Sequence, residues 1–283
     1  MDITLDAVMD TVRIVPFLFL CYLAMEALEH VAGDKTEDAV KRAGAWGPLI
    51  GSLLGALPQC GFSTAAATLY SGRVITLGTL IAVFLATSDE MIPIMVAEQA
   101  PLDLLVKILA CKVLIGMAMG FAIDMFLRLT HRVGAMHFHI HEMCHDNDCE
   151  CSHGIWRSAL RHTLQVTLFV LAVSFALDAV MAFVGEDALA QVLASNPVLA
   201  VLASGTVGLI PNCAASVVIT ELYLGGALST GAMMAGLLVS AGVGLLVLAR
   251  ANRPVSRTVL IVVLLWVLGV AWGFAFELAG ITF

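Results

Sequence analysis

Two short segments of the sequence carry a proline, an amide, a thiol and a hydroxyl in the same order. Residues 57–63 read LPQCGFS, and residues 210–216 read IPNCAAS. Proline interrupts a helix, so each segment predicts a tip where one half-helix ends in free carbonyls and the next begins with free N–H groups. Such groups could replace part of an ion's hydration, and the thiols favour a softer ion such as Zn(II), Cu(I) or trivalent arsenic. The candidate residues are Pro58, Gln59, Cys60, Ser63, Pro211, Asn212, Cys213 and Ser216.

The same two tips also have a purely structural interpretation. Proline would make the break, serine would cap the following helix and cysteine would pack as a small hydrophobic side chain. The sequence therefore leaves metal–thiolate bonding by Cys60 and Cys213 open.

A second ligand-rich segment lies near the middle of the chain. Its metal-binding candidates are His137, His139, His141, Cys144, His145, Cys149, Cys151 and His153. Imidazole and thiolate at this density suit Zn(II), Ni(II), Co(II) or copper. The spacing of the last three ligands is tighter than in a structural zinc finger, which favours a flexible capture or sensing site. The alternative is a polar linker without a ligand.

Ionisable side chains inside apolar segments form a third group, because a charge within a bilayer is costly and is usually functional. Asp89, Glu90, Lys112 and Glu221 lie within predicted membrane segments. We expect an acid from another helix, Asp89 or Glu90, to pair with Lys112. A buried carboxylate that exchanges a proton for a cation would give coupled antiport. Glu26 and Asp178 are further candidates, placed nearer to the ends of their spans.

Composition defines the environment of these residues. Of the 283 residues, 13% are charged and 60% are hydrophobic, and the mean hydropathy is +0.97. A soluble domain of this size would lack the polar residues to cover its surface. The composition excludes an ordinary soluble enzyme, a disordered chain and a nucleic-acid binder. Long unbroken apolar runs also exclude a transmembrane barrel, so we expect an all-α polytopic membrane protein.

The chain matches itself at a constant offset of 153 residues. Identical pairs include Pro58/Pro211, Cys60/Cys213, Tyr70/Tyr223 and Gly78/Gly231, and the acids Asp124 and Glu277 are related by the same offset. Matching Pro, Cys and Tyr at one offset is hard to obtain by chance. The sequence therefore predicts two membrane repeats, residues 1–130 and 158–283, joined by a His/Cys-rich loop at 131–157.

Each repeat is predicted to contain three spanning helices and one broken segment. The spans are 12–32, 74–98 and 101–129 in the first half, and 158–184, 228–250 and 255–279 in the second. The broken segments, 46–72 and 198–225, have arms too short to cross a hydrocarbon core of roughly 30 Å.

Positive charge sets the predicted topology. Lys and Arg flank the central loop and the connection near residue 253, whereas 185–197 contains neither. With basic connections inside, both broken segments become re-entrant hairpins and the halves are inverted. This places the loop in the cytoplasm and the C-terminus outside, with ten helices if the hairpin arms are counted separately. The alternative is a parallel repeat with broken helices that cross once.

The motifs at 57–63, 76–93 and 208–216, together with the His/Cys loop, resemble those of the ten-helix heavy-metal exporters. This family is distantly grouped with arsenical permeases, and some members are labelled manganese transporters. The resemblance covers nearly the whole chain and implies a bacterial inner-membrane exporter of a metal or metalloid. Manganese, a harder ion, would prefer Asp89, Glu90, Glu221 and amide oxygens to thiols.

The sequence thus favours a secondary-active exporter of a divalent metal of the Mn or Zn class, coupled to protons. We expect no enzyme activity and no required cofactor, with the metal ion as substrate. Besides the lipid bilayer and a metal ion or metalloid, the sequence leaves a homo-oligomer open and suggests no nucleic-acid partner. An arsenical or metalloid efflux permease is the alternative within this class.

An intramembrane enzyme or a metal sensor is the second alternative. Residues 141–145 match the His-Glu-x-x-His pattern of zinc proteases. A chance match is expected in so His-rich a polar tract. A sensor predicts that deletion of 137–153 abolishes the response, whereas a transporter should retain some flux.

Overall fold

The computed structural model describes residues 44–58, 60–88, 91–130, 197–211, 213–252 and 255–283, together with scattered helical positions between 15 and 23 and between 160 and 175. Every regular element in these ranges is helical. The predicted spans 12–32 and 158–184 lie largely outside the described residues, and the central loop lies wholly outside them.

The helices of the two halves follow one another in the same order. The first half contains a short 3-10 turn at Gly44–Trp46 and then α3 (Gly47–Gly55), α4 (Cys60–Ser71), α5 (Leu77–Ala86), α6 (Met91–Ala97) and α7 (Leu102–Leu129). The second half contains α11 (Pro197–Gly208), α12 (Cys213–Leu224), α13 (Thr230–Val239), α14 (Gly244–Ala251) and α15 (Val255–Ala279). The bounds of α4 and α12, and of α5 and α13, differ by the sequence offset of 153 at both ends. The sequence repeat therefore encodes a repeated order of helices.

Four helical segments of the described part are long and apolar enough to cross a membrane. They are Leu77–Val96, Leu102–Leu129, Thr230–Ala251 and Val255–Ala279. The most apolar windows of the first and third are 75% and 94% buried within the protein, against 28% and 33% for the other two. The chain is therefore a multi-pass membrane protein in which α7 and α15 present apolar side chains outward and α5 and α13 form the interior.

The two central spans, predicted at 74–98 and 228–250, are each interrupted between two helices, which was not predicted. Helix α5 ends at Ala86 before α6 begins at Met91, and α13 ends at Val239 before α14 begins at Gly244. Non-helical backbone at membrane depth is tolerated only inside a protein or beside a water-filled cavity. The high burial of both segments meets this requirement.

Local hydrogen bonds satisfy part of the backbone freed at the first interruption. Thr87 Oγ1 donates to the Val83 carbonyl at 2.8 Å, and Ser88 Oγ donates to the Ala86 carbonyl at 3.0 Å. These hydroxyls replace intrahelical N–H donors that the last turn of α5 lacks. The sequence signal is the Thr-Ser pair, which also occurs inside continuous helices.

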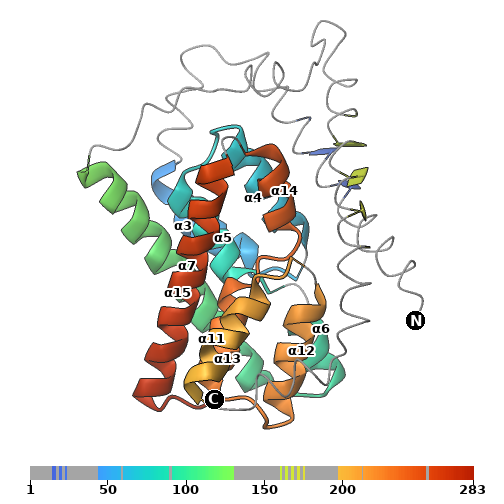
Figure 1. Ribbon diagram of the computed structural model, residues 1–283, viewed down its shortest axis with the longest axis vertical. Helices are drawn as coiled ribbons and strands as arrows, with labels where there is room; N and C mark the ends of the chain where they lie inside the picture. The colour runs from blue at the N-terminus through green and yellow to red at the C-terminus, as the bar shows by residue number, and fades with distance from the viewer. Residues whose placement is uncertain are drawn as a thin grey trace, which may run out of the picture.

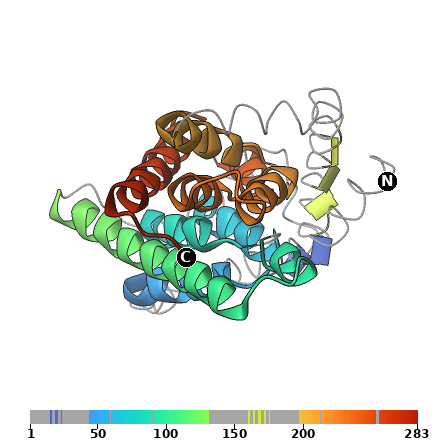
Figure 2. The same ribbon diagram turned by 90° about the horizontal axis from the view of Figure 1, so that it is seen from below.

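The halves pack crosswise at both ends of the molecule. Helix α4 of the first half packs against α14 of the second, and α12 of the second half packs against α6 of the first. Figure 1 shows these two pairs at opposite ends of the long axis, with α7 and α15 running in opposite directions. Seen along that axis, the first-half helices lie on one side and the second-half helices on the other (Figure 2). The interior helices α5 and α13 meet between them.

Paired glycines let the helices within each half approach closely. A Cβ atom at Gly78 would lie 2.2 Å from the Gly120 carbonyl oxygen, and one at Gly231 would lie 2.6 Å from the Gly273 carbonyl oxygen. These four positions are two repeat-related pairs. The repeat thus gives the α5–α7 pair and the α13–α15 pair the same kind of close contact.

Candidate functional site

Both predicted tips are breaks between helices, as the prolines indicated. Pro58 lies between α3 and α4, and Pro211 lies between α11 and α12. Pro58 is exposed and Pro211 is half-buried. Cys60 and Cys213 are the first residues of α4 and α12, while Gln59 and Asn212, and the side chains of both cysteines, lie outside the described residues. The predicted ligand role of these four side chains therefore stays a prediction.

The serines of the tips are buried in the first turns of their helices. Ser63 is 1% exposed and Ser216 is 8% exposed. A Cβ atom at Gly244, the first residue of α14, would lie 2.9 Å from the Ser63 Cβ and 2.9 Å from its carbonyl oxygen. The start of α4 is thus in direct contact with the interruption between α13 and α14. A tip of one half and a helix break of the other half meet in the interior.

Lys112 connects the two interrupted helices. It lies on α7, is 1% exposed, and its Nζ donates to the carbonyls of Thr87 and Leu237. The hydrogen bond to Leu237 is 2.8 Å long. Thr87 is the C-cap of α5 and Leu237 belongs to the last turn of α13. Both carbonyls belong to helix C-terminal ends, where the helix dipole places partial negative charge.

The carbonyl partners of Lys112 were not predicted, because nothing in the sequence marked these two helix ends as convergent. The expected acid partners, Asp89 and Glu90, lie outside the described residues. Their pairing with Lys112 stays a prediction beside the two observed contacts.

Glu221, a further predicted site residue, does not share the burial of Lys112. Glu221 lies on α12 with an exposed side chain. Glu26, Asp178 and all eight predicted ligands of the loop lie outside the described residues. Within the part of the chain that the structure describes, no three or more His, Cys, Asp or Glu side chains gather into a group suited to a metal ion.

Asp124 and Glu277 accept hydrogen bonds at the N-termini of the interior helices α5 and α13. The sequence had identified these acids only as a repeat-related pair. Asp124 accepts hydrogen bonds from Thr76 Oγ1 at 2.6 Å and from the Gly78 N–H at 2.9 Å. Glu277 accepts one from Ser229 Oγ at 2.8 Å. Thr76 and Ser229 are the N-caps of α5 and α13. A carboxylate at a helix N-terminus is favoured by the free N–H groups and the helix dipole.

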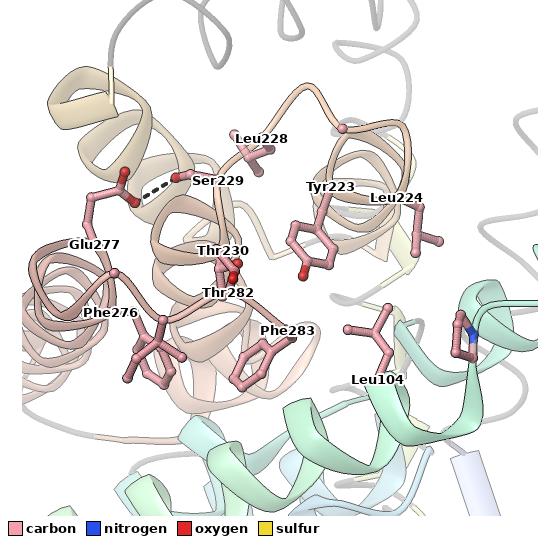
Figure 3. Close-up of a pocket in the computed structure, with 14 residues that line it drawn as sticks. Leu104, Tyr223, Leu224, Leu228, Ser229, Thr230, Phe276, Glu277, Thr282 and Phe283 are labelled. Atoms are coloured by element: carbon pink, nitrogen blue, oxygen red, sulfur yellow. Dashed lines mark hydrogen bonds between the residues drawn. The ribbon is translucent and has the colours of Figure 1, made fainter.

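A pocket of about 500 Å³ opens beside the second of these caps. Its lining combines residues of the start of α13, the ends of α12 and α15, the start of α7 and the C-terminal Phe283. Figure 3 shows Leu104, Tyr223 and Phe283 around it, with the Ser229–Glu277 hydrogen bond nearby. The C-terminus, whose last residue lines the pocket, lies at the lower end of the molecule in Figure 1.

Interrupted interior helices and four helical segments able to cross a membrane define the class as a polytopic α-helical membrane protein. A family model described as "Putative, 10TM heavy-metal exporter" matches residues 1–162. The match covers more than half of the chain, and the chain belongs to this family. This is a transporter family rather than an enzyme class. Searches of curated proteins and of solved structures found no match.

Proposed function

We propose that this protein exports a divalent transition-metal ion of the Mn or Zn class from the bacterial cytoplasm by proton-coupled secondary transport. The observation that carries the proposal is the contact between Ser63 at the first tip and Gly244 at the interruption of α13–α14. Discontinuous helices that meet in the interior of a membrane protein supply carbonyl and hydroxyl ligands for ions. Family membership supports a heavy-metal substrate.

We further propose that the two halves are inverted across the membrane and that α3–α4 and α11–α12 are re-entrant hairpins. The crosswise packing of α4 with α14 and of α12 with α6 supports this, because a two-fold axis in the membrane plane exchanges these pairs. Arg73, Arg128 and Arg250 then belong to the cytoplasmic side, in keeping with the positive-inside rule. The pocket beside Phe283 would open to the outside.

The proposed path runs from the loop to the interior centre. The His and Cys side chains of 137–153 would collect the ion in the cytoplasm. The tips and the acids Asp89, Glu90 and Glu221 would carry it across, and a carboxylate that releases the metal would take up a proton. Carboxylate and amide oxygens suit Mn(II), whereas the thiols of Cys60 and Cys213 would add affinity for Zn(II).

Metal accumulation in cells tests this proposal. Cells that express the protein should accumulate less Mn(II) or Zn(II) than cells without it, in a panel that also includes Ni(II), Co(II), copper and arsenite. A double variant, Cys60→Ser with Cys213→Ser, should keep Mn(II) export and weaken Zn(II) export, because only the thiols are lost.

Cys111→Ser is the matched control, since Cys111 lies on α7 and belongs to neither tip segment. It should leave export unchanged. Arsenite export that disappears in the double variant would instead favour a metalloid permease. Unchanged accumulation of every ion in cells with the unsubstituted protein would defeat the export proposal.

A further inference from the structure

A buried ammonium group stands where two helix C-termini converge. Lys112 Nζ donates to the carbonyl of Thr87, the C-cap of α5, and to that of Leu237, in the last turn of α13. Its side chain is 1% exposed. The two acceptors belong to different halves of the protein, so one ammonium joins the interior helices of both.

The carbonyls that hold this ammonium are the kind that bind small cations. The last four carbonyls of a helix have no intrahelical partner, and the dipole places partial negative charge there. In transporters, unwound backbone and half-helix C-termini coordinate monovalent ions. The oxygens of Thr87 and Leu237 therefore form part of a cation site that Lys112 fills.

The repeat shows that this cation belongs to one half only. The residue related to Lys112 by the offset of 153 is Leu265 on α15, and it is fully buried. The surrounding α5–α7 and α13–α15 packing is otherwise repeated. A charge at one of two equivalent positions indicates a specific role, because an apolar side chain fills the other position.

We propose that Lys112 is a tethered cation that occupies a binding site for a small monovalent cation, formed by the helix-end carbonyls of Thr87 and Leu237. The ammonium neutralises the two helix ends and holds the interrupted helices together. A protein with its own cation at this position needs no bound sodium or potassium there. The proposal rests on the contacts of Lys112 and does not require metal transport.

Removing the tethered cation should expose the site to free ions. Lys112→Ala leaves space and removes the ammonium donor of both carbonyls, whereas Lys112→Met fills the space with a neutral side chain. Each purified variant, in detergent, is heated in choline chloride with increasing ammonium, methylammonium, sodium or potassium chloride at constant ionic strength.

The Lys112→Ala protein should be less stable than the unsubstituted protein in choline and should gain on the order of 5 °C in Tm at saturating concentrations of at least one small cation. The unsubstituted protein and Lys112→Met should show no such saturable gain. Leu265→Ala, a cavity at the repeat-related position, is the matched control and should not respond to cations.

A Lys112→Ala protein that unfolds at the same temperature in every salt would overturn the proposal. So would an equal gain in Lys112→Met, which would indicate a general salt effect. If Lys112→Ala does not fold, Lys112→Ser is measured in the same salts. Failure of both variants to fold in any small cation would also overturn it, because the free ion should replace the ammonium. All of these readouts are independent of metal export, so they stand whether or not export is observed.

Discussion

The Asp124 carboxylate accepts two hydrogen bonds at the start of α5, from Thr76 and from the Gly78 N–H, whereas Glu277 accepts one from Ser229 at the start of α13. Asp124 is also the more deeply buried of the two acids. Hydrogen bonds to a charged group contribute about 1.5–3 kcal/mol each. We therefore expect Asp124→Ala to reduce stability more than Glu277→Ala, measured by thermal unfolding of the purified proteins in detergent.

Asp103→Ala provides the control for this comparison. Asp103 lies on the same helix, α7, but is exposed and pairs with Lys107 at the surface, and such pairs contribute about 0–1 kcal/mol. An equal loss of stability in Asp103→Ala and Asp124→Ala would contradict the assigned role of Asp124.

The role of Lys112 was predictable from the sequence only in part. A lysine in an apolar segment already indicated a buried partner and a functional role. Its partners at the ends of α5 and α13 could not be predicted, because a backbone carbonyl is available only where a helix stops. The sequence pattern does not mark those stops.

At the scale of elements, the repeated glycines set the distance between the interior and outer helices. A Cβ atom at Gly231 would lie 2.5 Å from Glu277 Oε2 and 2.6 Å from the Gly273 carbonyl oxygen. Gly231→Ala should therefore lower stability by about 1–3 kcal/mol, the usual cost of overpacking. The measurement is again thermal unfolding in detergent.

Gly44→Ala is the matched substitution, because a Cβ atom there would meet only the Thr76 methyl group at 3.9 Å. It should change stability by less than about 0.5 kcal/mol. A loss as large as that of Gly231→Ala would show that close helix approach is not the cause.

The helices themselves were largely predictable. Apolar runs and the prolines at 58 and 211 located α3–α4 and α11–α12, and the long span at 255–279 coincides with α15. The interruptions of α5–α6 and α13–α14 were missed. Thr, Ser and Gly residues are compatible with a continuous membrane helix, and Asp89 and Glu90 were interpreted as acids within a span and not as the site of a break. Tertiary contacts, including the approach of Ser63 to Gly244, accompany these breaks.

At the scale of the whole molecule, the duplicated sequence predicted a duplicated structure, and the bounds of α4 and α12, and of α5 and α13, differ by the same offset of 153. The crosswise contacts between halves could not be predicted, because an offset within one chain carries no information about which surfaces meet. Those contacts bring the tip at Ser63 in the first half next to the break between α13 and α14 in the second half. The proposed ion path depends on this arrangement.

Ion flux through the purified protein in liposomes tests the central claim most directly. Proteoliposomes that contain a metal-sensitive dye are supplied in turn with Mn(II), Zn(II), Ni(II), Co(II), copper or arsenite, with and without a pH gradient. The proposed proton-coupled transport requires that Mn(II) or Zn(II) enter faster than into protein-free liposomes, and that the gradient accelerate entry until an ionophore dissipates it. Entry no faster than into protein-free liposomes, for every ion and in both gradient directions, would contradict it.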